Sequence, residues 1–198
     1  HSFEYQTLPG ELQERAAQAV GKTPGEHDLF LSLLGTHGDE ADWQTRSSSR
    51  GHQAIPITRE TVKKIPMITR LFQQMGIDLG LLLGEGSPGI NVSGIERSYG
   101  VFYVPDAAGS PYVPAQDFVE KYGIHSVIGS GAMLPSGDLS IYLGFTRLHL
   151  EEGAAINIAP LVSLFWQRAF PWLDQGIFRS CAGRPDGTAA RKITRIVR

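Results

Sequence analysis

The segment YGIHSVIGSGAMLPSGDLSIYLGFTR, residues 122–147, decides the fold class because it has the pattern of two strands joined by a tight turn. Residues 123–131 and 138–147 are the strand candidates, and a Pro-Ser-Gly-Asp turn separates them. Short apolar runs bounded by glycine and proline are typical of an antiparallel hairpin. The run Gly-Val-Phe-Tyr-Val at 100–104 adds a third strand. We therefore predict that these three strands lie adjacent, or nearly so, in one antiparallel sheet.

Segments with the signals of helices surround the three strands. Residues 58–76 begin at Thr58, a good N-cap, and then place apolar residues at three- and four-residue spacing. Pro66 predicts either a kink in this helix or its true first turn. Further helices are predicted at 9–20, 25–34, 115–122 and 150–170, while 77–83 stays open between helix and strand.

Strands joined by tight turns and flanked by helices indicate an α+β fold with a central antiparallel β-sheet. We expect the helices at 62–75 and 150–170 to bury their apolar faces on or beside this sheet. Burial of Phe72 and of Phe165 should each contribute roughly 1.5–3 kcal/mol to stability.

The composition is that of one ordinary globular domain. The chain has 198 residues, 41% of them hydrophobic, and a formal net charge of -2. We predict a single domain over 1–178 and a basic, flexible tail at 179–198. The near-neutral charge leaves no electrostatic footprint for nucleic acid or an anionic membrane, and no apolar run is long enough to span a bilayer. The single cysteine, Cys181, excludes an internal disulfide and a multi-thiolate metal site, which favours the cytoplasm.

Four segments carry a resemblance to a known family. They are GTHGDEADW (35–43), SRGHQAIPI (49–57), VFYVPDAAGSPYVPAQDFV (101–119) and the hairpin at 122–147. Together they resemble a GAF-like sensor region of bacterial signalling proteins, found beside PAS domains and histidine-kinase or cyclase output modules. The resemblance covers about 30–170, and it implies a cytoplasmic, non-catalytic sensory domain that binds an unidentified small ligand and transmits to an output module. The resemblance assigns no catalytic or ligand-binding role to any residue of this chain.

The loop after the strand at 100–104 has two interpretations. Pro105, Pro111 and Pro114 make it rigid, which suits either the lip of a preformed small-molecule pocket or a structural corner. A pocket would be bordered by the sheet, the 36–57 loop and the 103–118 loop. The expected ligand-binding residues are Trp43, Arg46, His52, Tyr103, Tyr112, Gln116 and His125.

Histidines and carboxylates suggest an alternative function, a metal-dependent enzyme or a metal or haem sensor. His37, Asp39 and His52 offer suitable groups, but their spacing matches no compact ligand motif, and Asp39 can instead cap a turn. His125 lies in an apolar strand, where it can face the core as a ligand to haem or bond a backbone carbonyl. His149 is expected to be exposed. The sequence requires no cofactor, and we expect no catalytic residues.

The last predicted helix indicates an oligomer. Its segment IAPLVSLFWQRAF, residues 158–170, carries more large apolar residues than one sheet-facing stripe needs. A second bare apolar face is unusual on a monomer. We therefore predict a homodimer through the terminal helices. In the alternative, the helix at 9–20 of the same chain packs on this second apolar face.

Overall fold

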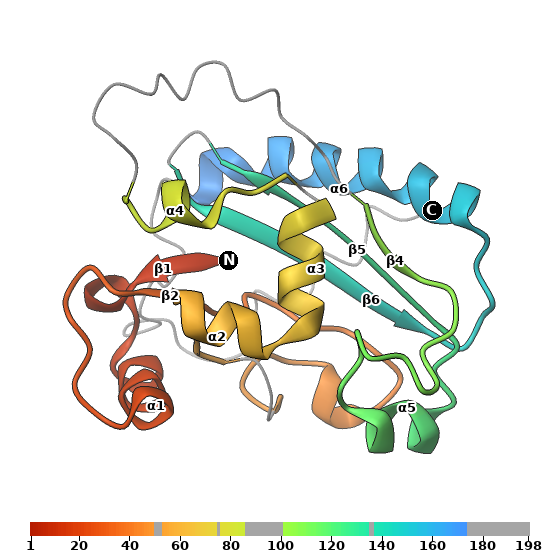
Figure 1. Cartoon of the computed structure of the whole chain (residues 1–198), viewed down its shortest axis with the longest axis horizontal. Helices are drawn as coiled ribbons and strands as arrows, with labels where there is room; N and C mark the ends of the chain where they lie inside the picture. Colours follow the sequence, from red (N-terminus) through yellow and green to blue (C-terminus); the bar gives the residue numbers. More distant parts are fainter. Residues whose placement is uncertain (50–52, 75, 86–100, 135–136, 174–198) are drawn as a thin grey trace, which may run out of the picture.

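The structure is a computed structural model, and it describes residues 1–49, 53–74, 76–85, 101–134 and 137–173 (Figure 1). Its larger sheet consists of β4 (Val101–Val104), β5 (Ser126–Met133) and β6 (Leu139–Thr146), in the order β4-β5-β6 with antiparallel neighbours. The predicted adjacency of these three strands is confirmed. The predicted tail at 179–198 lies outside the described residues.

A glycine lets the three strands of this sheet approach closely at its centre. Gly129 on β5 lies opposite Phe102 on β4 and Leu143 on β6. A Cβ atom at this position would lie 2.8 Å from Leu143 Cδ2 and 3.1 Å from the carbonyl oxygen of Tyr142. Because a side chain has no room there, the central strand needs glycine at this point.

The main core lies on one face of this sheet. Phe102, Val104, Val127 and Leu139 alternate onto that face and are buried. Buried side chains from α2 (Arg59–Lys64), α3 (Pro66–Gln74) and α5 (Gln116–Tyr122) pack into this core. On the other face, the helix α6 (Glu152–Leu173) packs beside β4 and β5 (Figure 1). The larger sheet is therefore enclosed between two helical layers.

A second, smaller sheet forms from the N-terminal part of the chain. It contains β1 (Ser2–Glu4), β2 (Leu29–Leu31) and β3 (Ile55–Pro56), again antiparallel and in that order. It packs with the 3-10 helix η1 (Tyr5–Thr7) and with α1 (Gly10–Val20), which confirms the helix predicted at 9–20. The expectation of one central sheet is thus corrected to two small sheets.

The helix predicted at 25–34 is wrong. Phe30 lies instead in the middle of β2, opposite Phe3 on β1 and Pro56 on β3. Its side chain is buried in the cluster around α1. Pairing with strands distant in sequence supplies the hydrogen bonds here, and this tertiary context overrides the local helical pattern.

Two helices replace the long one predicted after Thr58. The Thr58 side chain accepts a hydrogen bond from the Thr61 backbone and caps α2. α2 ends at Lys64, and Pro66 is the first residue of α3, which agrees with the second of its two interpretations. The undecided segment at 77–83 contains a short helix, α4 (Leu79–Leu82).

The last helix buries a different stripe from the one expected. The side chains of α6 that point toward the protein are those of Ala155, Ile158, Val162 and Ala169, and of these Ala155 and Val162 are buried. Phe72 in α3 is only 3% exposed, as predicted, whereas Phe165 in α6 is 61% exposed. The prediction for Phe165 is wrong because the small and β-branched side chains of α6 make the contact with the protein.

Candidate functional site

Three polar residues meet at one end of the larger sheet. Asp106 follows β4, His125 precedes β5 directly, and His149 follows β6. In an antiparallel sheet, the end of one strand lies beside the start of the next. Val104 is accordingly paired with Val127, and Ser126 with Thr146. The register therefore brings together three residues that are distant in sequence.

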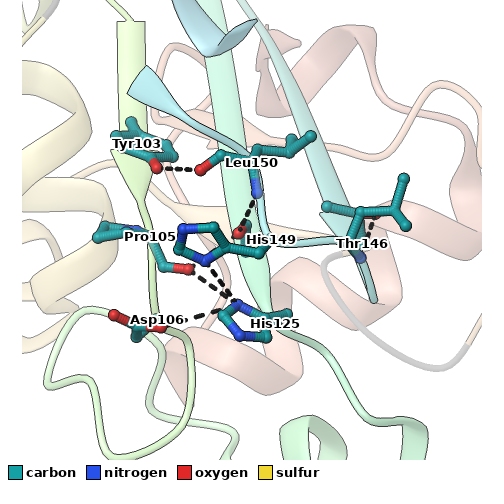
Figure 2. A network of polar contacts seen from close by, with 9 residues as sticks. Tyr103, Pro105, Asp106, His125, Thr146, His149 and Leu150 are labelled. Carbon is teal, nitrogen blue, oxygen red and sulfur yellow. Dashed lines mark hydrogen bonds and ion pairs between the residues drawn. The ribbon is translucent and has the colours of Figure 1, made fainter. Parts of the chain in front are cut away.

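The geometry of this group suits a bound cation (Figure 2). Nδ1 of His125 lies 3.4 Å from Nδ1 of His149 and 3.7 Å from Oδ1 of Asp106. One ligand atom from each residue lies within 4.8 Å of the others, and all three residues are exposed. The two imidazole rings meet edge to face, with centroids 4.8 Å apart. We call these three residues the His-Asp cluster.

Backbone hydrogen bonds hold the cluster in place. The His125 amide donates to the Thr146 carbonyl at 2.8 Å, and the Ala107 amide donates to the His125 carbonyl at 2.7 Å. The Pro105 carbonyl accepts from Ser126 Oγ at 2.8 Å and lies 3.2 Å from His125 Nδ1 (Figure 2). Because these bonds join β4, β5 and β6, the ligand atoms project from a rigid scaffold.

The connection to α6 belongs to the same network. The Leu150 amide donates to Ser126 Oγ at 3.1 Å, and the Tyr103 hydroxyl donates to the Leu150 carbonyl (Figure 2). α6 begins at Glu152, so only a short connector separates His149 from the helix. His149 therefore directly precedes a residue that is hydrogen-bonded to both β4 and β5.

Carboxylates lie near the Tyr103 hydroxyl, beside the cluster. Burial raises the pKa of the Tyr103 hydroxyl above its usual value, and the nearby carboxylates of Glu152, Asp106 and Glu151 raise it further. These carboxylates oppose formation of a phenolate, and for the same reason they attract a cation. Glu151 and Glu152 thus add negative charge near Tyr103, on the side of the cluster that leads into α6.

Two imidazoles and one carboxylate form a ligand set for divalent transition metals. Zinc binds histidine nitrogen and carboxylate oxygen at about 2.0–2.2 Å, so tetrahedral neighbours lie about 3.3 Å apart. The separations of 3.4 Å and 3.7 Å from His125 Nδ1 are close to that value, and the third pair of ligand atoms lies within 4.8 Å. Three protein ligands leave at least one position for water or another molecule. The cluster can thus hold a cation after small side-chain rotations.

The structure agrees with the second of the two interpretations of His125, because its Nδ1 contacts the backbone carbonyl of Pro105. Its side chain does not face the core but is exposed beside Asp106 and His149. His149 is exposed, as predicted. Tyr103 lies near the cluster through its bond to Leu150. Of the seven predicted ligand residues, His125 and Tyr103 are therefore brought together.

Two other predicted ligand residues, Trp43 and Tyr112, lie elsewhere in the fold. Trp43, in the 3-10 helix η2 (Ala41–Trp43), packs against the rings of Phe118 and Tyr122, with centroids 5.7 Å and 4.6 Å away. Tyr112 lies under the guanidinium of Arg70, at 4.0 Å from the ring centroid. Both rings thus have partners within the protein.

Gln116 holds the loop that follows β4. Its Oε1 accepts from the Gly109 amide at 2.7 Å, and its Nε2 donates to the carbonyls of Ala107 and Val113 at 3.0 Å and 2.6 Å. One amide side chain thereby replaces several backbone partners in an irregular segment. This use of Gln116 supports the interpretation of the loop as a structural corner.

His37 and Asp39, two of the three alternative metal ligands in the 36–57 loop, do not belong to a group of close metal-binding side chains in the described part of the chain. Asp39 forms an ion pair with Arg147, at 3.0 Å between Oδ2 and the guanidinium. His37 is exposed, Arg46 is partly buried, and His52 lies outside the described residues. Within the described ranges, the His-Asp cluster is the group of His, Cys, Asp and Glu residues close enough to hold an ion.

Sequence reasoning missed Asp106 and His149 as partners of His125. A signal for them exists, because Asp106 and His149 each follow a predicted strand, His125 lies near the start of the third, and these strand ends meet in an antiparallel sheet. Within the described residues, no helix is long and apolar enough to cross a membrane. Comparisons with protein-family models, with curated protein sequences and with solved structures find no match to this chain.

Proposed function

We propose that this chain is a non-catalytic regulatory domain that senses a divalent transition-metal ion through Asp106, His125 and His149. The observation that carries the proposal is the convergence of two imidazoles and a carboxylate, with their ligand atoms within 4.8 Å, directly before α6. The exposed position of the cluster suits reversible binding, which a sensor requires. A buried structural site would exchange its ion too slowly for this purpose.

The GAF-like resemblance supports the sensory class. It suggests a cytoplasmic domain attached to an output module of the histidine-kinase or cyclase type. The metal ion takes the place of the unidentified small ligand in this proposal. The mixed α/β architecture with antiparallel sheets is compatible with such a module.

The route from the ion to the output module runs through α6. A cation on Nδ1 replaces the proton at that atom, so His125 cannot donate to the Pro105 carbonyl while the ion is bound. His149 turns toward the ion on the other side of the cluster. Leu150, held by Ser126 and Tyr103, passes this change to the first turn of α6. Occupancy of the cluster thereby biases the position of the helix.

The ligand chemistry defines the class of ion. Imidazole nitrogen suits zinc, copper, nickel, cobalt and iron, whereas magnesium and calcium prefer all-oxygen sites. We therefore expect Zn²⁺ to bind and Mg²⁺ not to bind at comparable concentration. Cobalt(II) serves as a spectroscopic probe, because its visible absorption reports the coordination geometry.

Isothermal titration of the chelator-treated chain with Zn²⁺ tests the proposal. We expect one site in the unmodified protein, and at least about tenfold weaker binding for His125→Ala and for His149→Ala. His37→Ala is the matched control, because His37 is also exposed but lies outside the cluster. The proposal is overturned if the unmodified chain binds no Zn²⁺, or if only His37→Ala weakens binding.

A further inference from the structure

The outer surface of α6 carries one continuous exposed ridge. Residues spaced by four form such a ridge on a helix. Glu152, Ile156, Pro160, Leu164 and Arg168 have this spacing, and all five are exposed. Ile156 is 54% exposed and Leu164 is 55% exposed, so the two large apolar side chains of the ridge face water.

Further apolar side chains lie beside this ridge. Leu161 is 62% exposed and Phe165 is 61% exposed. Scattered single apolar residues are normal on a protein surface, but several large ones on one helix face indicate an interaction surface. The buried stripe of the helix, around Ala155 and Val162, lies on the opposite side. The ridge is thus directed away from the protein.

The order of residues along the ridge is symmetric about Pro160. Going outward from Pro160, the first pair is apolar on both sides, Ile156 and Leu164. The second pair is acidic at one end, Glu152, and basic at the other, Arg168. In an antiparallel pair of such ridges, apolar residues oppose apolar residues, and each acid opposes a base. A parallel pair would instead place like charges together at both ends.

We infer that α6 pairs with α6 of a second copy of this chain, antiparallel and with the twofold axis near Pro160. Ridges of the four-residue type pack against each other at about −50° between the helix axes. In this arrangement Glu152 lies near Arg168 of the other copy, and the reverse pair forms at the opposite end. This inference rests on the surface of α6 alone and does not depend on metal binding.

Charge reversal tests both the pairing and its direction. Glu152→Arg places two basic residues at each end of the interface, and Arg168→Glu places two acidic residues there. Each single variant should weaken the dimer by about tenfold or more, because like charges oppose one another twice. The double variant should dimerise as the unmodified chain does. An equimolar mixture of the two single variants should also recover, as a heterodimer.

Sedimentation velocity of the full chain over a dilution series measures these effects. The monomer mass is 21.6 kDa, so the dimer is recognised at twice that value. Thermal melting of each variant checks folding, and we expect little change at these exposed positions. Leu164→Asp provides a second variant at the centre of the ridge, where it should also weaken the dimer.

The outcomes separate the inference from its rivals. A dimer that responds to the single changes and recovers in the mixture supports antiparallel α6 pairing. A monomer at every concentration overturns it, and shows that the ridge does not bind a second copy of this chain. A dimer that is insensitive to both charge reversals, or one that fails to recover on mixing, also overturns it.

Discussion

The Tyr103 hydroxyl donates a hydrogen bond to the backbone carbonyl of Leu150, 47 residues further along the chain. This bond joins β4 to the connector that leads into α6. The Leu150 amide is held at the same time by Ser126 on β5. The backbone amide and the backbone carbonyl of Leu150 are therefore both hydrogen-bonded to the larger sheet, which fixes the connector between the His-Asp cluster and α6.

Tyr103→Phe should lower the free energy of unfolding by about 0.5–1.5 kcal/mol, because it removes this donor and keeps the ring. Urea denaturation followed by circular dichroism measures the change. Tyr142→Phe is the matched control, because Tyr142 is 44% exposed on β6 and should be nearly neutral. Equal losses for the two variants would show that the bond to Leu150 contributes nothing specific.

Zinc should stabilise the folded chain through the His-Asp cluster. Binding to the folded state alone adds about 2.7 kcal/mol when free ligand is 100 times its dissociation constant. We therefore expect a higher melting temperature with Zn²⁺ and full reversal by a chelator. His149→Ala should reduce the shift to about half if it weakens binding tenfold, while His37→Ala should keep it. An equal shift in His149→Ala would place the stabilising ion elsewhere.

Gln116→Ala should destabilise the chain and loosen its 105–115 loop. The side chain bonds the Gly109 amide and the carbonyls of Ala107 and Val113, which stay without this partner in the variant. We expect a loss of about 1–3 kcal/mol. Hydrogen exchange should quicken at Gly109. Glu120→Ala, on the exposed side of α5, is the control and should change neither quantity.

Gly129→Ala should lower stability by about 1–3 kcal/mol through overpacking. The new methyl group would meet Leu143 Cδ2 at 2.8 Å and Phe102 Cβ at 3.3 Å, on the strands at either side. Gly10→Ala is the control, because a Cβ there meets nothing within 4 Å. Thermal unfolding compares the two variants. A neutral Gly129→Ala would mean that the sheet relaxes around the added atom.

Local signals predicted the strands and helices around the larger sheet. The turn before Leu139 and the run of strand-forming residues Val101–Val104 act within a few residues, so they can be recognised in the sequence. The helix predicted at 25–34 failed because Phe30 belongs to a strand whose partners are distant. Propensity is a weak guide where pairing with distant strands supplies the hydrogen bonds.

The candidate site depended on information that local patterns do not carry. His125 was recognised as a candidate, but its neighbours Asp106 and His149 come from other strand ends. Trp43 and Gln116 looked like ligand residues because aromatic and amide groups suit both binding and packing. Their partners, Phe118 and the loop carbonyls, are what distinguish the two uses.

Residues close together in the chain suffice to predict the strand and helix segments of the second half, the cap at Thr58 and the surplus of apolar residues in α6. Long-range contacts divide the strands into two sheets, bring Asp106, His125 and His149 together, and make α6 bury Ala155 rather than Phe165. Strand register and helix rotation set these outcomes, and both are fixed by contacts between residues far apart in the chain.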